Sequence, residues 1–214
     1  GVAAPVTGVK SVTGTAVNDA PTATNLSAAD SYTEDTPLNL TDIVISDVDS
    51  ANVTATLTLS NIAAGSLSTG TSGAVTSTYN AGTGVWTASG ALADVNSLLA
   101  GLTFTPTANF NSSFTIATSV SDGVAAPITG VKAITGTAVN DAPVITTVAP
   151  DVTFVEGGLP QVIDALGTVT DSDSTDFAGG VLSVEITQNA NADDRLLVGN
   201  FGTGPGQVGV SGSD

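Results

Sequence analysis

Many of the acidic residues lie in short sequence motifs that recur along the chain. Of the side chains in this sequence, their carboxylates are the best suited to chemistry. Asn-Asp-Ala-Pro occurs at 18–21 and 140–143, and Asp-x-Asp-Ser occurs at 47–50 and 171–174. An Asp-x-Asp pair in an extended loop places both carboxylates on one side, where they can face a single ion. Calcium takes six to eight hard oxygen ligands at about 2.3–2.6 Å. We therefore expect divalent-cation binding where these motifs converge.

Each motif taken singly has an ordinary explanation. Asn-Asp-Ala-Pro is also typical of a turn, and Asp-x-Asp of a solvated loop. Their joint recurrence at matching places favours the cation site. Two familiar calcium loops do not fit, because an EF-hand starting at Asp171 would need glutamate where Leu182 stands. The glycines of 199–206 likewise lack the aspartate of a calcium-binding nonapeptide repeat.

The amino-acid composition disfavours several classes of function. The 214 residues include 20 acidic and 3 basic residues, for a net charge of −17, which disfavours nucleic-acid partners and anionic membrane surfaces. Acidic charge alone would also serve solubility.

There is no Cys and no His, which excludes thiolate and imidazole metal sites and nucleophilic triads built on them. The paired Asp193-Asp194 could serve glycoside chemistry, but a solvated loop explains it better, so we expect no enzyme. No apolar run approaches the 18 residues typical of a membrane span.

The chain contains a nearly exact copy of one segment. Residues 1–21 and 123–143 differ only at Val6/Ile128, Ser11/Ala133 and Val12/Ile134. Copying at a domain-sized period of 122 residues is typical of a tandem array. We therefore expect three parts: 1–17 as the terminal strand of a preceding repeat, 18–139 as one complete repeat, and 140–214 as a partial next repeat, all within a slice of a longer protein.

The elements that must position the acids are strands. Apolar and hydroxyl residues alternate through 52–60, which predicts a half-buried strand. Turn motifs separate it from further strands, predicted at 74–79, 84–89, 102–106, 114–120 and 128–139. A short helix is predicted at 92–101, with Asp94 as its N-cap, a stripe of Val95, Leu98 and Leu99, and Gly101 as its end. Short strands at this spacing indicate an all-β sandwich.

Taken together, these motifs resemble the cadherin-like repeats of giant, type I-secreted bacterial surface adhesins. The matching segments are Val17–Pro21, Glu34–Leu38, Asp47–Ser50, Phe104–Asn111 and Ser121–Gly123. The resemblance covers the complete repeat and, more loosely, 140–176. It implies tandem Ig-like or cadherin-like Greek-key β-sandwiches at the bacterial cell surface or in a secreted, extracellular protein. Their partners would be the neighbouring repeats of the same polypeptide, with other copies of the chain as a second candidate.

The resemblance also implies Ca²⁺ at each junction between repeats, where it stiffens a non-catalytic stalk that supports cell adhesion or biofilm formation. Carried over, the ligands before the complete repeat are Asn18, Asp19, Asp47, Asp49 and Asp122. Those after it are Glu34, Asn140, Asp141, Asp171 and Asp173. The Asp-Arg-Glu motif of animal cadherins is absent from the sequence, which leaves the number of ions at each junction open.

Two other functions remain open from the sequence. One is a self-assembling filament, in which the head of one copy completes the tail of another by strand addition; a monomeric mass in solution would exclude it. The other is a glycan- or ice-binding module. The row Thr54, Thr56 and Thr58 could form a flat binding face, although a solvated strand explains it better. Glycans usually require exposed aromatics, and we expect the single Trp86 to lie in the core.

Overall fold

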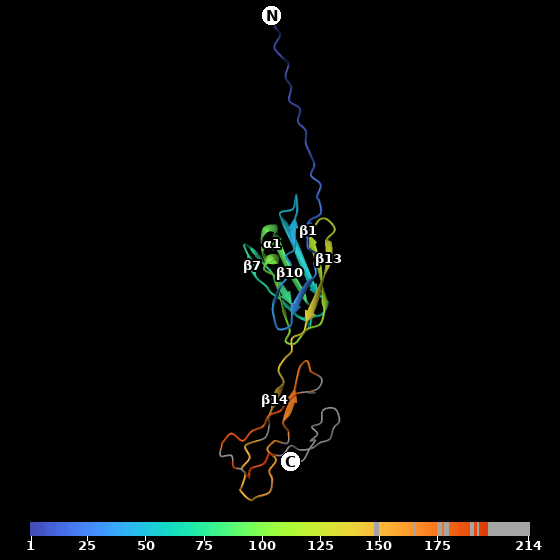
Figure 1. The fold of residues 1–214 in the computed structure, drawn as a ribbon. Coiled ribbons are helices and arrows are strands. Elements are labelled where there is room, and N and C mark those ends of the chain that lie inside the picture. The colour runs from blue at the N-terminus through green and yellow to red at the C-terminus, as the bar shows by residue number, and fades with distance from the viewer. Residues whose placement is uncertain are drawn as a thin grey trace. The chain divides into compact units, whose positions relative to one another are not determined.

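A computed structural model gives the fold of most of the chain. It divides into two compact units, 1–139 and 140–214, and each is taken here by itself. The described residues are 1–147, 150–164, 166–174, 177, 180–188, 191 and 193–196. The glycine-rich stretch 199–206 singled out above lies outside them. The first unit is mostly β-strand with one short helix, so the all-β prediction is confirmed (Figure 1).

The largest sheet of the first unit has six strands in the order β2-β13-β12-β5-β10-β9. All neighbours are antiparallel except β13 and β2, which run parallel. The strands are β2 (Asp30–Thr33), β5 (Asn52–Leu59), β9 (Thr78–Asn80), β10 (Val85–Ala91), β12 (Phe114–Ser121) and β13 (Ile128–Thr137). The predicted strand at 74–79 is instead two short pieces, because β9 follows a separate hairpin of β7 (Thr71–Ser72) and β8 (Val75–Thr76).

A second layer faces this sheet. It consists of a three-stranded sheet, β3 (Leu38–Asn39), β11 (Thr103–Pro106) and β6 (Gly65–Leu67), in the order β3-β11-β6. A separate pair, β1 (Thr22–Thr24) and β4 (Val44–Ser46), is antiparallel. The short strands of this layer were not predicted, because two or three residues are too few to show an alternating pattern.

The core lies between these layers and follows the predicted alternation. On β5 every second residue from Val53 to Leu59 is buried, while the threonines between them are half-buried. Rings from both layers meet there, since Phe104 of β11 lies 4.9 Å from Phe114 of β12 between ring centroids. Trp86 is fully buried and donates its indole N–H to the Ser68 carbonyl at 2.9 Å. Its predicted place in the core is therefore confirmed.

The predicted helix is present as α1 (Leu92–Ala100), and Val95 and Leu99 are buried on its inner face. The prediction for Asp94 is wrong. Ala91 occupies the N-cap without a side-chain hydrogen bond, and Asp94 lies in the first turn, where its carboxylate accepts a hydrogen bond from the Ser72 hydroxyl at 3.2 Å. The helix begins two residues earlier than the aspartate because β10 runs directly into it. Within the described residues, no helix is long and apolar enough to cross a membrane.

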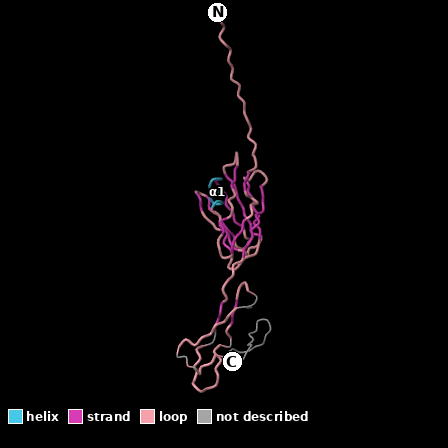
Figure 2. The backbone as a smooth tube through the Cα atoms, in the orientation of Figure 1, coloured by secondary structure: helices cyan, strands magenta, loops and turns pink. Residues whose placement is uncertain are grey.

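The two copies of the repeated segment have different structures. Residues 128–137 form β13, paired on both sides. The equivalent residues 6–15 form no strand and are exposed along their whole length, as the loop colouring of Figure 2 shows. A strand needs a partner for its backbone N–H and C=O groups. Nearly identical sequence therefore becomes a strand only where neighbouring strands receive it.

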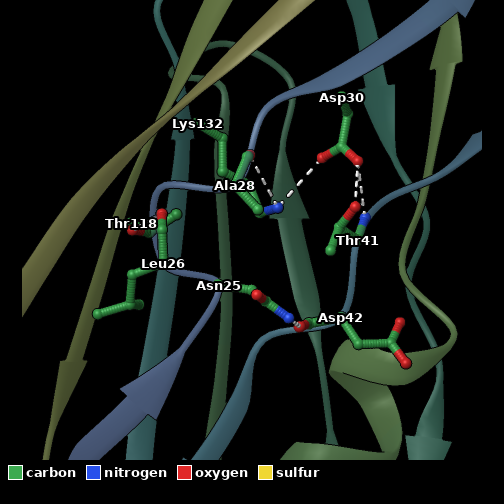
Figure 3. A network of polar contacts seen from close by, with 8 residues as sticks. All are labelled: Asn25, Leu26, Ala28, Asp30, Thr41, Asp42, Thr118 and Lys132. Atoms are coloured by element: carbon green, nitrogen blue, oxygen red, sulfur yellow. Dashed lines mark hydrogen bonds and ion pairs between the residues drawn. The ribbon is translucent and has the colours of Figure 1, made fainter.

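A buried ion pair joins β13 to β2 (Figure 3). Lys132 is fully buried, and its Nζ lies 3.1 Å from Asp30 Oδ2 and 3.3 Å from the Ala28 carbonyl. The other Asp30 oxygen accepts hydrogen bonds from the backbone N–H (3.0 Å) and hydroxyl of Thr41. A buried ammonium is tolerated only when it is paired and hydrogen-bonded in this way. The pair therefore fixes how β13 sits beside β2.

The second unit begins with the same frame as the first. Its described strands are β14 (Val144–Thr146) and β15 (Thr168–Thr170), which pair antiparallel with Val144 opposite Thr170. In the first unit Thr22 stands opposite Ser46. The two registers agree with sequence offsets of 122 and 124, so the two extra residues of the second copy fall between the paired strands.

We expect Lys132→Met to lower the free energy of unfolding by about 3–5 kcal/mol, because it leaves the Asp30 carboxylate buried without a counter-charge. Replacing both partners, as Lys132→Met with Asp30→Leu, should cost clearly less. Urea denaturation followed by the fluorescence of Trp86, the only Trp in the sequence, reports on the first unit alone. A single variant within about 0.5 kcal/mol of wild type, the range of a neutral surface change, would contradict the role of the pair.

Candidate metal-binding junctions

Three loops bring the first set of predicted ligands to one end of the first unit. Asn18 and Asp19 directly precede β1, and Asp47 and Asp49 follow β4, its partner strand. Asp122 stands between β12 and β13. Because β12 also pairs with β5, the strand that follows the Asp-x-Asp loop, sheet register places all three loops together. We refer to Asn18, Asp19, Asp47, Asp49 and Asp122 as the first junction.

Hydrogen bonds connect these loops directly. The Asn18 amide donates to Asp122 Oδ2 at 2.8 Å, and the backbone N–H of Asp19 donates to Asp49 Oδ2 at 2.9 Å. The Ser50 hydroxyl lies 3.5 Å from Asn18 Oδ1. The structure thus brings together the residues that the sequence grouped at this junction, from positions up to 104 residues apart.

Asp47 has one oxygen that is satisfied and one that is not. Its Oδ1 accepts the backbone N–H groups of Asp49 (3.1 Å) and Ser50 (2.7 Å), which holds the loop in a tight turn. Its Oδ2 is buried and has no hydrogen-bond partner, and among the described residues it is the only buried side-chain oxygen or nitrogen in that state. A buried, unpaired carboxylate oxygen is costly. It is the feature of this loop that a bound cation would relieve.

Asp122 is held as a charged acceptor. Its Oδ1 accepts the backbone N–H groups of Val124 and Ala125, both at 2.9 Å, while Oδ2 accepts the Asn18 amide. These bonds, that from Asn18 first, hold the pKa of the carboxyl below its usual range. The carboxylate is therefore kept in the ionised form that both Asn18 and a metal ion prefer.

The second unit repeats this arrangement within itself. The backbone N–H of Asp141 donates to Asp173 Oδ2 at 2.9 Å, the same bond at the same length as between Asp19 and Asp49. Asp171 Oδ1 accepts the backbone N–H groups of Asp173 (3.2 Å) and Ser174 (2.9 Å), as Asp47 does in its loop. Hydrogen bonding, first with the Asp173 side chain and then with the Ser174 backbone, lowers the pKa of Asp171. The recurring sequence motif thus folds into the same polar arrangement in both units.

A contact made by Ser172 in the second unit has no counterpart in the first. Ser172 stands where the first loop has Val48, and its hydroxyl donates to Asp141 Oδ2 at 2.7 Å. In both units the junction asparagine hydrogen-bonds to the residue that follows it. The Asn18 amide donates to the Asp19 carbonyl at 3.0 Å, and the Asn140 amide donates to the Asp141 carbonyl at 2.7 Å. The interpretation of Asn-Asp-Ala-Pro as a turn is therefore compatible with its interpretation as a source of metal ligands.

Glu34 has a different environment from the first junction. It is 3% exposed, and its carboxylate accepts the backbone N–H of Val139 and the Asn111 amide, the latter at 3.0 Å. These contacts lie beyond the C-terminal end of β13, whereas Asp122 precedes its N-terminal end, so Glu34 sits at the opposite end of the unit. Burial of the phenol raises the pKa of Tyr32, and the nearby charge of Glu34 raises it further. The four residues predicted to share a site with Glu34 belong to the second unit.

The donors of the first junction suit a hard cation. It offers carboxylate and amide oxygens, with no sulfur or imidazole, which is the donor chemistry of calcium. As the side chains stand, the described residues contain no group of three or more Asp or Glu arranged to hold a metal ion. Several of these oxygens accept hydrogen bonds instead, and Asp47 Oδ2 is the buried one that has no partner.

Sequence reasoning included Ser50 and Ser174 in the recurring motif but gave them no role. In the structure each closes an Asp-x-Asp turn through its backbone N–H. Asn111 had no signal as a partner of Glu34, because 77 residues separate them. The Lys132–Asp30 pair was not predicted either, because these two residues are also far apart in the sequence.

The threonine face of the six-stranded sheet is hollowed. Cross-strand rows of hydroxyls, such as Thr87-Thr56-Ser119-Thr129, run across it. A groove of about 510 Å³ crosses β5, β12 and β13 on this face. The large aromatic rings of the first unit are buried or half-buried, so none forms an exposed platform on which a sugar could stack.

Comparison with known proteins does not identify the chain. No protein-family model matches it, and no curated protein matches it.

We expect Asp122→Ala to lower the melting temperature of the first unit more at pH 7 than at pH 3. The pKa of Asp122 is lowered by folding, so its contribution is present above the usual carboxyl pKa and is lost as the pH falls through the lowered value. Thermal unfolding of both proteins at the two pH values, followed by Trp86 fluorescence, tests this. Asp151→Ala, an exposed acid of the second unit, is the control. An equal Asp122→Ala effect at both pH values would show that the charged form is not what matters.

Proposed function

We propose that this chain is a non-catalytic stalk segment of a bacterial surface adhesin, built of cadherin-like Greek-key repeats whose junctions bind Ca²⁺. The observation that supports this most directly is the polar motif found twice. In both units an Asn-Asp pair and an Asp-x-Asp-Ser loop are joined by equivalent hydrogen bonds. The motif recurs although the surrounding strands differ in sequence, which is expected when the junction itself carries the function.

Electrostatics gives the cation a physical role. The first junction gathers the carboxylates of Asp47, Asp49 and Asp122 at one end of a chain with a net charge of −17. Like charges at short range repel, and a divalent cation converts that repulsion into attraction. Asp47 Oδ2, buried without a partner, is the oxygen with most to gain.

The position of the motif accounts for stiffening. Asn18 and Asp19 belong to the connecting segment, whereas Asp49 and Asp122 belong to loops fixed by the sandwich. An ion shared between them ties the connection to the body of the repeat. A connection fixed in this way at each joint extends an array of repeats, which is what a stalk requires.

The other functions have less support. A glycan-binding module would need an aromatic platform, and the aromatic rings of the first unit, including Trp86, Phe104 and Tyr32, are buried or half-buried. The row Thr54, Thr56 and Thr58 is half-buried on the outer side of β5, which an ordinary solvated strand of a sandwich already explains. An enzyme would need a reactive group in a cleft, whereas the acids of the first junction lie in loops that hydrogen-bond to one another.

Calcium is expected to raise the melting temperature of the chain and to increase its maximum dimension, and EDTA should reverse both changes. Calcium titration followed by differential scanning calorimetry and small-angle X-ray scattering measures the two effects. For a protein that binds only when folded, a hundredfold excess of calcium over Kd adds about 2.7 kcal/mol. An unchanged dimension and melting temperature in EDTA would contradict the proposal.

Matched variants distinguish site binding from general screening of charge. Asp47→Asn together with Asp49→Asn should abolish the calcium response of the first junction, with Trp86 as the reporter. Asp42→Asn together with Asp35→Asn removes the same charge from positions outside the predicted ligands and should keep the response. Equal loss in both double variants would indicate non-specific screening.

A further inference from the structure

Glu34 is a buried carboxylate at the point where the chain leaves the first unit. It is 3% exposed, and a carboxylate is costly to bury unless its oxygens are hydrogen-bonded. One oxygen accepts the backbone N–H of Val139, and the other accepts the Asn111 amide at 3.0 Å. Neither partner is charged, so these bonds do not form an ion pair. The carboxylate is best explained by the chain segment that it holds.

The contact with Val139 lies where the pairing of β2 and β13 ends. At that end the Glu34 N–H donates to the Thr137 carbonyl at 3.0 Å. In a regular parallel ladder the next bond would join the Val139 N–H to the backbone carbonyl of Glu34. Here the Val139 N–H donates to the Glu34 side chain. The side chain thus holds the outgoing chain beyond Thr137, the last residue of β13.

The main chain turns directly after Glu34, which brings the regular ladder to an end. Asp35 has a positive φ of 59°, a left-handed conformation that Asp and Asn tolerate better than most residues. Asn109 also has a φ of 59°, and its backbone N–H donates to Asp35 Oδ1 at 2.9 Å. This bond ties the turn after β2 to the loop before β12, which carries Asn111.

Two further contacts fix the backbone around Asn111. The Tyr32 hydroxyl donates to the Ser112 carbonyl at 2.9 Å. The Asn111 carbonyl oxygen also lies so close to β13 that a Cβ added to Gly136 would be 2.3 Å from it. Asn111 is therefore held in place when its amide binds one oxygen of Glu34, and the other oxygen is left facing Val139.

These contacts give a role to two sequence motifs that the first junction does not use. The acidic pair Glu34-Asp35 opens one of them, and Asn109 and Asn111 belong to the other, Phe104–Asn111. In the structure each acid accepts a hydrogen bond from one of the two asparagines. The two motifs thus build one arrangement, and the segment after β13 ends in it.

We propose that Glu34, positioned by Asn111, is a clamp on the exit segment 138–139, and that it fixes the direction in which the chain leaves the first unit without a bound ion. Val139 is 48% exposed and belongs to no strand, so packing contributes little to its placement. It directly precedes the Asn140-Asp141 pair. The inference is separate from calcium binding, and its tests are carried out in EDTA.

Amide hydrogen exchange measured by NMR reads the clamp at Val139 itself. Glu34→Ala should speed the exchange of the Val139 N–H at least about tenfold, because a hydrogen bond to a charged acceptor is lost. The N–H of Leu59, which donates to the Gly84 carbonyl at 3.0 Å, is the internal reference for the sandwich. The effect at Val139 should clearly exceed the effect at Leu59. Equal effects would indicate general loosening of the unit and would contradict a clamp.

Three variants separate the hydrogen bond from the charge. Glu34→Gln keeps an acceptor oxygen, so its Val139 N–H should exchange more slowly than in Glu34→Ala; it also preserves the test if Glu34→Ala does not fold. Asn111→Ala removes only the group that orients the carboxylate and should have a smaller effect than Glu34→Ala. Glu156→Ala is the matched control, because Glu156 stands 122 residues after Glu34 and is exposed. It should leave Val139 exchange unchanged.

Spin labelling measures the exit segment as a whole. The sequence has no Cys, so a nitroxide on Ala138→Cys reports on the segment alone. A nitroxide on Thr135→Cys, an exposed position within β13, reports on the strand. Glu34→Ala should increase the mobility of the label at 138 and leave the label at 135 unchanged. The proposal is overturned if the Val139 N–H is unprotected in wild type, or if Glu34→Ala changes neither its exchange beyond that of Leu59 nor the mobility at 138.

Discussion

Pairing of β13 on both edges is the interaction on which the first unit depends. β13 lies antiparallel to β12 on one side and parallel to β2 on the other, so it joins the end of the repeat to its beginning. The Lys132–Asp30 pair fixes this closure from inside. A one-residue slip would expose the lysine and bury its neighbours. The closure also sets where Asp122 stands and where the chain leaves the unit, because the two lie at opposite ends of β13.

The junction depends on this closure in turn. Its predicted ligands come from the connection before β1, the loop after β4 and the turn before β13, and no two of these are close in sequence. The hydrogen bond between Asn18 and Asp122 spans 104 residues, yet it forms at the point where the last hairpin returns to the start of the repeat. The copied segment includes both β13 and the Asn-Asp that follows it, so one block of sequence specifies the closure and the next joint together.

Few polar side chains of the first unit are buried, and each lies in a different environment. Lys132 is matched by carboxylate and carbonyl oxygens, and Glu34 is matched by a backbone N–H and an amide. Asp47 is the exception, with one oxygen buried and without a partner. In an otherwise well-satisfied unit, this oxygen is the observation in favour of the cation site that we propose.

The sequence by itself determined the local features of this protein. Alternation specified β5, β10, β12 and β13, the helical stripe specified α1, and recurrence specified the loops of the junctions, because these signals are carried by neighbouring residues. Only the tertiary structure decided the partners of Lys132 and Glu34, the short strands of the second layer, and the role of Asp94. Strand formation depends on hydrogen-bond partners from elsewhere in the chain, and no local pattern contains them.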